Sequence, residues 1–352
     1  MKMIQYKILF LYTELAGYTV NCLNEAIRTN KNIEIHVIRW TLNKEAPFEF
    51  KFSKRLKVIE KNKINLLNYY NDIKPTHVIC SGWSDKEYIH LIKTIKDKSK
   101  KILMFDNYWE GTIKQYIGRI ILPFTITKHF DYCWLPGEIQ EKYAKKIGFK
   151  EEQIFLGFYA TDLSPFTKAF SQNLSEKRRK FPKKFLYVGR YLKLKGILDL
   201  YQAFILFSKN NLEWELHCVG NGNLFESRIK HPKIFHHGFI QPEDLPKITK
   251  CTGVFIMPSH YDHWGMAVQE FAAAGYPLIC SDRVGANCSF LKENRNGYIF
   301  KAKNVNSLLN AMNKIANLHD DKLFEFSLKS NELSKLYNTD TWNKTLNIII
   351  HK

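Results

Sequence analysis

The chain has 352 residues, more than a single hydrophobic core usually supports, so two domains are expected. Hydrophobic residues make up 45% of the sequence and aromatic residues 14%, which excludes an intrinsically disordered chain. A formal net charge of +19 would attract nucleic acid, an anionic membrane or acidic small molecules alike, so charge alone does not identify the partner.

Cysteines and apolar segments narrow the class of protein further. The seven cysteines are scattered without CxxC or His/Cys spacing, which disfavours a disulfide framework and structural zinc and favours a reducing cytoplasm. The apolar run 8–12 is too short for the core of a signal peptide and is better explained as a first β-strand. The sequence contains no run of about 18 apolar residues, so any membrane contact is expected to be peripheral.

Short apolar runs alternate with helical patterns along the whole chain. This alternation predicts parallel strands joined by crossover helices, as in Rossmann-like domains. The expected strands are 7–12, 33–40, 77–81, 101–105, 132–135, 185–188, 214–219, 234–236, 253–257 and 278–281. In the second half, the expected helices lie near 197–208, 245–250, 267–274 and 305–316.

The expected fold class is α/β, with two doubly wound parallel-sheet domains facing a central cleft. Residues 1–165 form the first domain and residues 166–336 the second, while 337–352 form a C-terminal helix that can return to the first domain. The cation-rich stretch 163–183 between them, with Lys177 among its cations, is predicted to be a solvated linker. A nucleic-acid site is disfavoured there because the cations are not interleaved with aromatic stacking platforms.

Ligands in such sheets bind where the strands end, because loop amides and helix N-termini converge there. The first strand opens into Thr13, Glu14 and, three residues on, Gly17, where a glycine would let the backbone approach a ligand. The alternative is that Gly17 only serves a turn.

The segment 185–196 is the strongest local feature of the sequence. A strand runs into Gly189, and the cations Arg190 and Lys195 precede a predicted helix. Two cations beside a helix N-terminus suit a diphosphate. On a surface loop, the same two side chains would merely be solvated.

A second polar loop lies between the strand 253–257 and the small-residue helix 267–274. Asp262 stands in this loop, and Glu270 lies inside the helix, which ends at Gly275. A buried carboxylate needs hydrogen-bond donors, so Glu270 is expected to meet either a ligand or a structural salt-bridge partner.

Together, these residues resemble the family-four (group 1) retaining glycosyltransferases of GT-B fold. The resemblance is specific in combination: a strand followed by Arg190 and Lys195, later Asp262 and Glu270, and then Ala-Gly-Tyr-Pro. It covers nearly the whole chain, because other segments resemble the turns, the base-side loop and the domain junction of the family. These segments are 156–158, 219–222, 237–239 and 296–298.

The resemblance implies a role for each matching residue. Arg190 and Lys195 would hold the donor's diphosphate, and Glu270 would accept hydrogen bonds from the ribose hydroxyls. Asp262 would lie near the transferred sugar, where the family usually has Glu. The other donor-binding residues implied are Gly17, Gly189, Gly220, Gly238, Phe239, Gly265, Met266 and Ala267.

On the acceptor side, the segment 105–112 occupies the place of a family loop that often contains His. Asp106 stands there instead, and is a further candidate catalytic residue beside Asp262, Arg190 and Lys195. Glu14, Asn107 and Trp109 are the predicted acceptor contacts, since aromatic faces stack on sugars and carboxylates bind hydroxyls. A packed Trp109 and a capping Asp106 are the structural alternative.

The expected function is transfer of a sugar from a nucleotide-sugar, a UDP- or GDP-sugar, to a saccharide or lipid-linked acceptor in surface polysaccharide or glycolipid assembly. The resemblance implies retention of anomeric configuration without a metal or other cofactor. The protein is expected to be cytoplasmic and able to bind the anionic inner face of the membrane, with cations around the stretch 120–126, and to have no nucleic-acid partner.

Three other classes compete with this interpretation. A GT-B epimerase or phosphorylase would share the scaffold and the diphosphate site. A basic membrane- or nucleic-acid-binding protein with vestigial transferase features would bind anions without turnover. A nicotinamide dehydrogenase is disfavoured, because Gly220 and Gly222 are not followed by the third glycine of the fingerprint.

Overall fold

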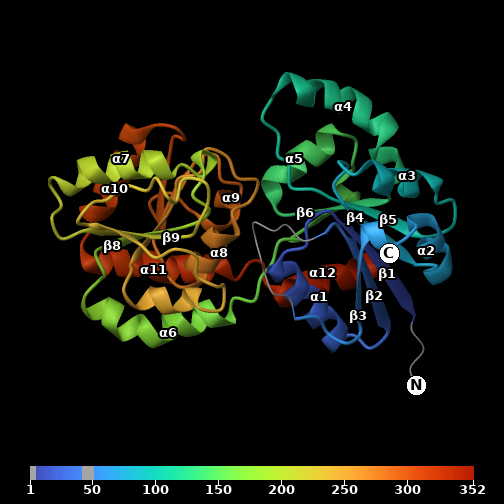
Figure 1. The fold of residues 1–352 in the computed structure, drawn as a ribbon, viewed down its shortest axis with the longest axis horizontal. Helices are drawn as coiled ribbons and strands as arrows, with labels where there is room; N and C mark the ends of the chain where they lie inside the picture. The colour runs from blue at the N-terminus through green and yellow to red at the C-terminus, as the bar shows by residue number, and fades with distance from the viewer. Residues whose placement is uncertain (1–4, 42–50) are drawn as a thin grey trace. The chain divides into compact units, whose positions relative to one another are not determined.

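The computed structural model describes residues 5–41 and 51–352, and the chain divides into two compact units (Figure 1). The first unit is Met1–Asp162 together with Tyr337–Lys352, and the second is Leu163–Leu336. The first unit therefore contains segments from both ends of the sequence.

The first unit is built on a seven-stranded parallel sheet with the order β3-β2-β1-β4-β5-β6-β7. Its strands are β1 Tyr6–Tyr12, β2 Ile33–Arg39, β3 Leu56–Glu60, β4 His77–Ser81, β5 Lys100–Met104, β6 Tyr132–Leu135 and β7 Ile154–Leu156. The sequence predicted the five inner strands but not the edge strands β3 and β7. Most residues of these two strands are only partly buried, so the continuous apolar run that marks a central strand is missing.

Helices cover both faces of this sheet. They are α1 Gly17–Thr29, α2 Leu66–Ile73, α3 Lys86–Thr94, α4 Ile113–Thr125, α5 Glu138–Lys146 and α12 Thr339–Ile350, with short 3₁₀ turns at Lys61–Lys63, Thr127–His129 and Glu151–Gln153. Alternate residues of β1 pack on opposite faces, Phe10 with α1 and α12, and Leu9 with α3 and α5.

The last helix, α12, is an integral part of the first unit. Trp342 is buried, its ring lies beside those of Phe10 and Trp134, and its indole N–H donates to the carbonyl of Phe158 at 3.0 Å. An indole buried with its N–H satisfied is a strong packing anchor.

The second unit has a six-stranded parallel sheet with the order β10-β9-β8-β11-β12-β13. Its strands are β8 Lys184–Val188, β9 Glu215–Val219, β10 Ile234–His236, β11 Val254–Met257, β12 Leu278–Ser281 and β13 Gly297–Phe300. Its helices are α6 Ser164–Arg179, α7 Ile197–Ser208, α8 Met266–Ala273, α9 Asn287–Phe290, α10 Val305–Ala316 and α11 Asp320–Ser334, with 3₁₀ turns at Lys193–Lys195 and Leu245–Lys250.

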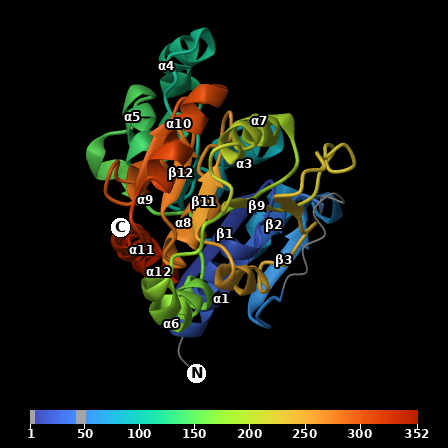
Figure 2. The same cartoon turned by 90° about the vertical axis from the view of Figure 1, so that its left-hand side faces the viewer.

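Helices cover both faces of the second sheet as well, so both units are doubly wound and Rossmann-like. The helices α7 and α10 lie side by side on one face, while α6, α8 and α11 gather on the other (Figures 1 and 2). The sequence did not predict the edge strand β13.

The prediction of a solvated linker over 163–183 is wrong. Most of that stretch is α6, which begins with Pro165 in its first turn and buries one face containing Phe166, Phe170 and Lys177. These residues recur at helical spacing, but Lys168 and the run of cations 177–180 gave the stretch the composition of a solvated linker.

Lys177 is the clearest departure from the expected solvation. Its ammonium lies 3.4 Å from the carbonyls of Ala274 and Gly275, at the C-terminal end of α8, and 4.2 Å from the ring centroid of Tyr276. Burial lowers the pKa of Lys177 to about 7, because a charged ammonium loses its hydration there.

Each sheet has one point where the order of the strands reverses, called its switch point below. In the first sheet this point lies between β1 and β4, and in the second between β8 and β11. The connections on either side leave toward opposite faces there, and in open α/β sheets ligands bind outside the carboxyl ends of those strands. The topology therefore marks one candidate site in each unit.

Candidate functional site

Three turns meet beyond the carboxyl ends of the strands β8, β9 and β10. The amide of Gly189 donates to the carbonyl of Val219 at 3.0 Å, and the amide of Gly220 donates to the carbonyl of Gly238 at 2.7 Å. Gly220 has φ +133°, and a Cβ there would lie 2.0 Å from the carbonyl oxygen of Gly189. Only glycine allows this close approach. The structure thus brings Gly189, Gly220 and Gly238 together.

Arg190 stands at the start of the loop that follows β8. Its backbone is held by the Tyr187 hydroxyl, which donates to the Arg190 carbonyl at 2.7 Å. The side chain is exposed, and within the part of the chain that the structure describes its guanidinium has no hydrogen-bond or ion-pair partner. An unpaired guanidinium on a fixed backbone is suited to bind a phosphate.

Lys195 and Asp262 form an ion pair across the β8/β11 switch point. Lys195 Nζ lies 2.6 Å from Asp262 Oδ2, and the two side chains are only 21% and 15% exposed. Their loops also approach closely, because Gly196 has φ +71° and a Cβ there would lie within 1.9 Å of the Pro258 carbonyl oxygen. The pair therefore joins Lys195, which the sequence resemblance predicts to hold the diphosphate, with Asp262, which it predicts to lie near the sugar.

The loop that carries Asp262 is fixed on both sides. The amide of Asp262 donates to the carbonyl of Arg283 at 3.0 Å, and the amide of Gly285 donates to the carbonyl of Asp262 at 3.1 Å. His260 Nε2 lies 2.8 Å from Asp199 Oδ2, in the first turn of α7. Because the backbone is held at several points, the Asp262 carboxylate has a defined position.

Helix α8 begins at this site. Its N-cap is Gly265, with φ +92° and no side-chain cap, so the amides of the first turn, which includes Met266 and Ala267, lack a side-chain acceptor. Such a helix N-terminus favours an anion.

Glu270 lies in the second turn of α8. Burial raises the pKa of its carboxyl from 4.5 to about 7. Among the residues that the structure describes, this carboxyl has no hydrogen-bond or ion-pair partner, so the structural salt bridge considered from the sequence is not formed there. A partly buried, unpaired carboxyl is well suited to accept hydrogen bonds from ligand hydroxyls.

The first unit has a cavity of about 500 Å³ at its own switch point. It is lined by residues that follow the carboxyl ends of β1, β4 and β5, and by the segment after β7. These residues are Tyr12, Thr13, Glu14, Leu15, Ala16, Tyr18, Thr19, Ser81, Gly82, Trp83, Ser84, Met104, Phe105, Asp106, Asn107, Phe158 and Tyr159. The mixture of aromatic, hydroxyl and carboxylate groups suits a carbohydrate.

Asp106 is held at the wall of this cavity. The Tyr159 hydroxyl donates to Asp106 Oδ2 at 2.9 Å, and the Gln140 amide donates to the Asp106 carbonyl at 3.2 Å. Burial raises the pKa of Tyr159 well above its usual range, so its hydroxyl stays protonated and able to donate.

The other residues predicted around this cavity are placed differently. Glu14 and Asn107 line it, and Gly17 begins α1 next to the lining residue Ala16. Trp109 packs instead against Tyr116 and Tyr143, with ring centroids 5.0 and 5.9 Å away, and Lys146 lies over its ring. The packed alternative for Trp109 therefore describes its contacts in the structure.

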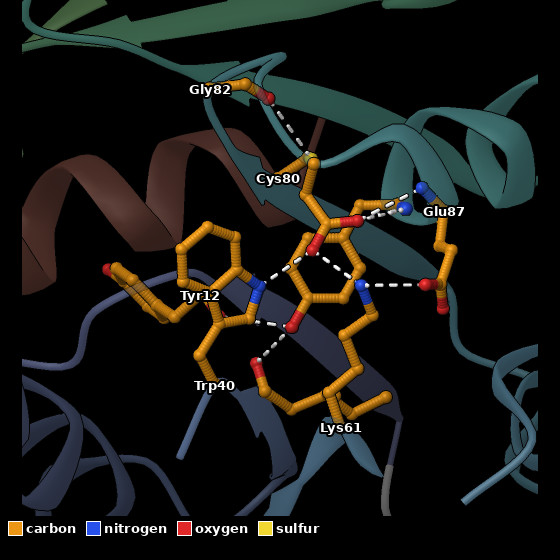
Figure 3. A network of polar contacts seen from close by, with 9 residues as sticks. Tyr12, Trp40, Lys61, Cys80, Gly82 and Glu87 are labelled. Atoms are coloured by element: carbon orange, nitrogen blue, oxygen red, sulfur yellow. Dashed lines mark hydrogen bonds and ion pairs between the residues drawn. The ribbon is translucent and has the colours of Figure 1, made fainter. Parts of the chain in front are cut away.

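A polar network that the sequence did not predict supports one wall of the cavity (Figure 3). Asp85 caps α3, and its Oδ2 accepts hydrogen bonds from Trp40 Nε1 and Lys61 Nζ, both at 2.6 Å. The Tyr88 hydroxyl donates to the carbonyl of Tyr12 at 3.0 Å, which ties α3 to the end of β1. The Ser-Asp-Lys signal for a helix N-cap at 84–86 was the available clue.

Neither a cluster of metal ligands nor a membrane-spanning helix occurs among the described residues. Within 5–41 and 51–352, no three His, Cys, Asp or Glu side chains gather in a way that could hold a metal ion. In the same ranges, no helix has both the length and the apolar character needed to cross a bilayer.

Solved structures share this fold along nearly the whole chain. Sucrose-phosphate synthase from Thermosynechococcus elongatus superposes with a TM-score of 0.75, at 16% identity over 99% of this chain and 98% of that one. Anabaena HepE in complex with UDP and glucose superposes with a TM-score of 0.71, at 12% identity over 99% and 100%. The two doubly wound parallel-sheet units therefore form a GT-B fold, as the sequence predicted.

Residues 170–325 match the family model described as glycosyl transferases group 1. This match covers most of the second unit and confirms the resemblance to group 1 glycosyltransferases found in the sequence. One relative is the Escherichia coli UDP-Gal:alpha-D-GlcNAc-diphosphoundecaprenol alpha-1,3-galactosyltransferase, 27% identical over 48% of this chain and 46% of that protein. Another is the Salmonella typhimurium lipopolysaccharide 1,6-galactosyltransferase, 26% identical over 48% and 50%. The chain spans about half the length of the curated relatives it matches.

Proposed function

We propose that this protein is a glycosyltransferase that moves a sugar from a nucleotide-sugar donor to a saccharide or lipid-linked saccharide acceptor. One observation carries the proposal. At the β8/β11 switch point, Arg190 stands exposed in the loop after β8, and the Lys195–Asp262 pair lies near the uncapped start of α8, the helix that contains the unpaired Glu270. The two cations are suited to bind the diphosphate of a donor, Asp262 its sugar and Glu270 its ribose.

In the proposed donor complex, Arg190 and Lys195 bind the diphosphate and Glu270 accepts hydrogen bonds from the ribose hydroxyls. Glycines at the three turns allow the backbone to approach the ligand, with Phe239 on the base side. The proposed donor is a UDP- or GDP-sugar, and a structure with the same fold, that of HepE, was solved with UDP.

The proposed chemistry is departure of the nucleoside diphosphate while positive charge develops at the anomeric carbon. Arg190, Lys195 and the N-terminus of α8 would stabilise the leaving group electrostatically, so the proposal includes no metal ion or other cofactor. Asp262 would stabilise the positive charge that develops on the sugar. Retention of anomeric configuration is part of the proposal through the family resemblance.

The proposed acceptor site is the cavity of the first unit, where Asp106, Asn107 and Glu14 offer carboxylate and amide groups to sugar hydroxyls. A place in surface polysaccharide or glycolipid assembly, at the cytoplasmic face of the membrane, completes the proposal. The name of one relative includes a diphosphoundecaprenol-linked sugar, and that of another includes lipopolysaccharide. Both names support this acceptor class.

A donor screen tests the proposed function. Purified protein would be incubated with UDP-, GDP-, ADP- and CMP-sugars in buffer containing a chelator, and donor hydrolysis and transfer to saccharide acceptors would be measured. We expect turnover with one nucleotide class, and calorimetric binding of the matching nucleoside diphosphate. Absence of both turnover and binding would refute the proposal, and conversion of the nucleotide-sugar into its epimer without transfer to any acceptor would favour an epimerase.

A further inference from the structure

Helix α4 exposes a continuous apolar face. Residues spaced four, three and four positions apart lie on one side of a helix, and here the exposed fractions reach 81% for Ile113 and 70% for both Ile120 and Phe124. The members of this face, called the α4 apolar face below, are Ile113, Ile117, Ile120 and Phe124. None of the helix's residues is fully buried.

The opposite side of α4 holds the helix to the first unit. Leu122 packs against the core under the sheet, and the Gln115 amide donates to the carbonyl of Tyr108 at 2.7 Å. The exposure of the apolar face is therefore a consequence of how α4 is seated and does not reflect a detached helix. Figure 1 shows α4 at the outer edge of its unit, beyond α5.

Charge at α4 points to an anionic partner. The helix contains Lys114 and Arg119 and no Asp or Glu. At helical spacing, these two cations flank the apolar face on opposite sides, where long side chains can reach outward while the apolar residues point away from the protein. An apolar stripe with flanking cations is the pattern of a helix that lies in a membrane interface.

We propose that α4 is an interfacial helix, whose apolar face inserts among the headgroups of an anionic bilayer. A second copy of this chain is a poorer occupant, since a symmetric contact would bring Lys114 and Arg119 of both copies together in a molecule of net charge +19. Of the lysines near this stretch, Lys101 plays no part: it lies in β5, with its ammonium on the carbonyl of Ile95.

The position of α4 links the membrane to the proposed acceptor cavity. Asp106 and Asn107 line the cavity, and six residues after Asn107 the α4 apolar face begins. Gln115 also accepts from the amide of Glu110 at 2.8 Å, which fixes the intervening loop to the helix. A lipid-linked acceptor would then reach the cavity from the bilayer. This part of the inference rests on the proposed function, whereas membrane insertion does not.

Vesicle binding of the full chain tests the insertion. The assay would use phosphatidylglycerol–phosphatidylcholine vesicles, with pure phosphatidylcholine as the neutral probe, at low and high salt. We expect stronger partitioning onto the anionic vesicles that weakens with salt, and a loss of about tenfold or more in the double variant Ile120→Ser/Phe124→Ser. The matched control is Leu212→Ser/Ile348→Ser, which removes two exposed apolar side chains elsewhere and should bind as wild type does.

Each result has a definite consequence. Failure of wild type to bind anionic vesicles, or equal binding by the α4 variant and the control, overturns the inference. A wild-type dimer that the α4 variant converts to a monomer would assign the face to a second copy instead. The α4 variant should keep donor hydrolysis, so loss of vesicle binding with hydrolysis intact supports insertion. Absence of hydrolysis in every variant would count against the proposed function and leave the vesicle result unaffected.

Discussion

Lys195 and Asp262 are separated by 67 positions in the sequence, yet their charged atoms lie 2.6 Å apart at the β8/β11 switch point. The pair has two consequences. It orients Lys195 where a diphosphate is proposed to bind, and it holds the Asp262 carboxylate beside that cation. A donor that binds Lys195 therefore competes with Asp262 for the same ammonium.

Replacing Asp262 with Asn separates these two roles. We expect the affinity for the nucleoside diphosphate to be unchanged or higher, because Lys195 loses its internal partner. We expect turnover to fall about tenfold or more, a loss of about 1.4 kcal/mol in the transition state. Calorimetry beside transfer rates would measure both quantities, and Asp262→Glu should retain part of the activity. Equal losses of rate and affinity would contradict this assignment.

The cations themselves are tested by Arg190→Ala and Lys195→Ala. Each variant should lose about 10- to 100-fold in affinity for the nucleoside diphosphate, since a charge-assisted hydrogen bond contributes about 1.5 to 3 kcal/mol. The matched control is Lys193→Ala, which removes an exposed cation from the same turn. If Arg190→Ala and Lys195→Ala bind the nucleotide as tightly as Lys193→Ala and wild type do, the proposed diphosphate site is wrong.

Glu270 predicts a pH dependence of stability. Its folded-state pKa of about 7 lies above the ordinary 4.5, so between these values the folded protein keeps a proton that the unfolded chain has released. The contribution of Glu270 to the free energy of unfolding is therefore fully present below about pH 4.5 and is lost as the pH rises through about 7. Glu270→Gln should match wild type near pH 4.5 and exceed it by about 1 to 2 kcal/mol near pH 8. Urea unfolding at the two pH values would detect this difference, and a parallel pH profile would refute it.

The buried ammonium of Lys177 predicts the opposite trend. Its folded-state pKa of about 7 lies below the ordinary 10.5, so the unfolded chain holds more protons between these values and stability rises with pH across that window. Lys177→Met should stabilise the protein by about 1 to 3 kcal/mol near pH 6, with a smaller gain near pH 10. Arg179→Met, an exposed change on the same helix, is the control in the unfolding assay. A destabilised Lys177→Met would instead show that the carbonyl contacts outweigh the burial cost.

Tyr159 is expected to position Asp106. Tyr159→Phe removes the hydroxyl that donates at 2.9 Å, so acceptor kcat/KM should fall about 5- to 10-fold, with nucleoside diphosphate affinity unchanged. Steady-state kinetics with varied acceptor, alongside calorimetry, would separate the effects. A fall in nucleotide affinity alone would show that this cavity does not act on the acceptor.

The sequence indicated the central strands and the polar loops at their ends because both have local signatures. Apolar runs mark strands that are buried on both faces, and the segment after β8 carries its glycine and cations within a few residues. Edge strands such as β3 lacked that signature. The error over α6 had a different cause, since its buried face includes a lysine, a residue type that composition alone assigns to the surface.

Contacts between distant residues could not be predicted in this way. The Lys195–Asp262 pair, the Tyr159 contact with Asp106 and the contacts of Asp85 with Trp40 and Lys61 each depend on how whole elements pack. Trp109 shows the same limit, because its neighbours Tyr116 and Tyr143 come from two helices whose positions the local pattern does not contain.

The burial of α12 in the first unit has a consequence for the order of events on the ribosome. Residues 163–336 are synthesised before Trp342, so every element of the second unit precedes the helix that covers Phe10. The first unit therefore cannot complete its core until α12 has been synthesised, although N-terminal domains generally fold first. A chain that ends at residue 336 would contain every element of the second unit and leave apolar surface of the first exposed to chaperones.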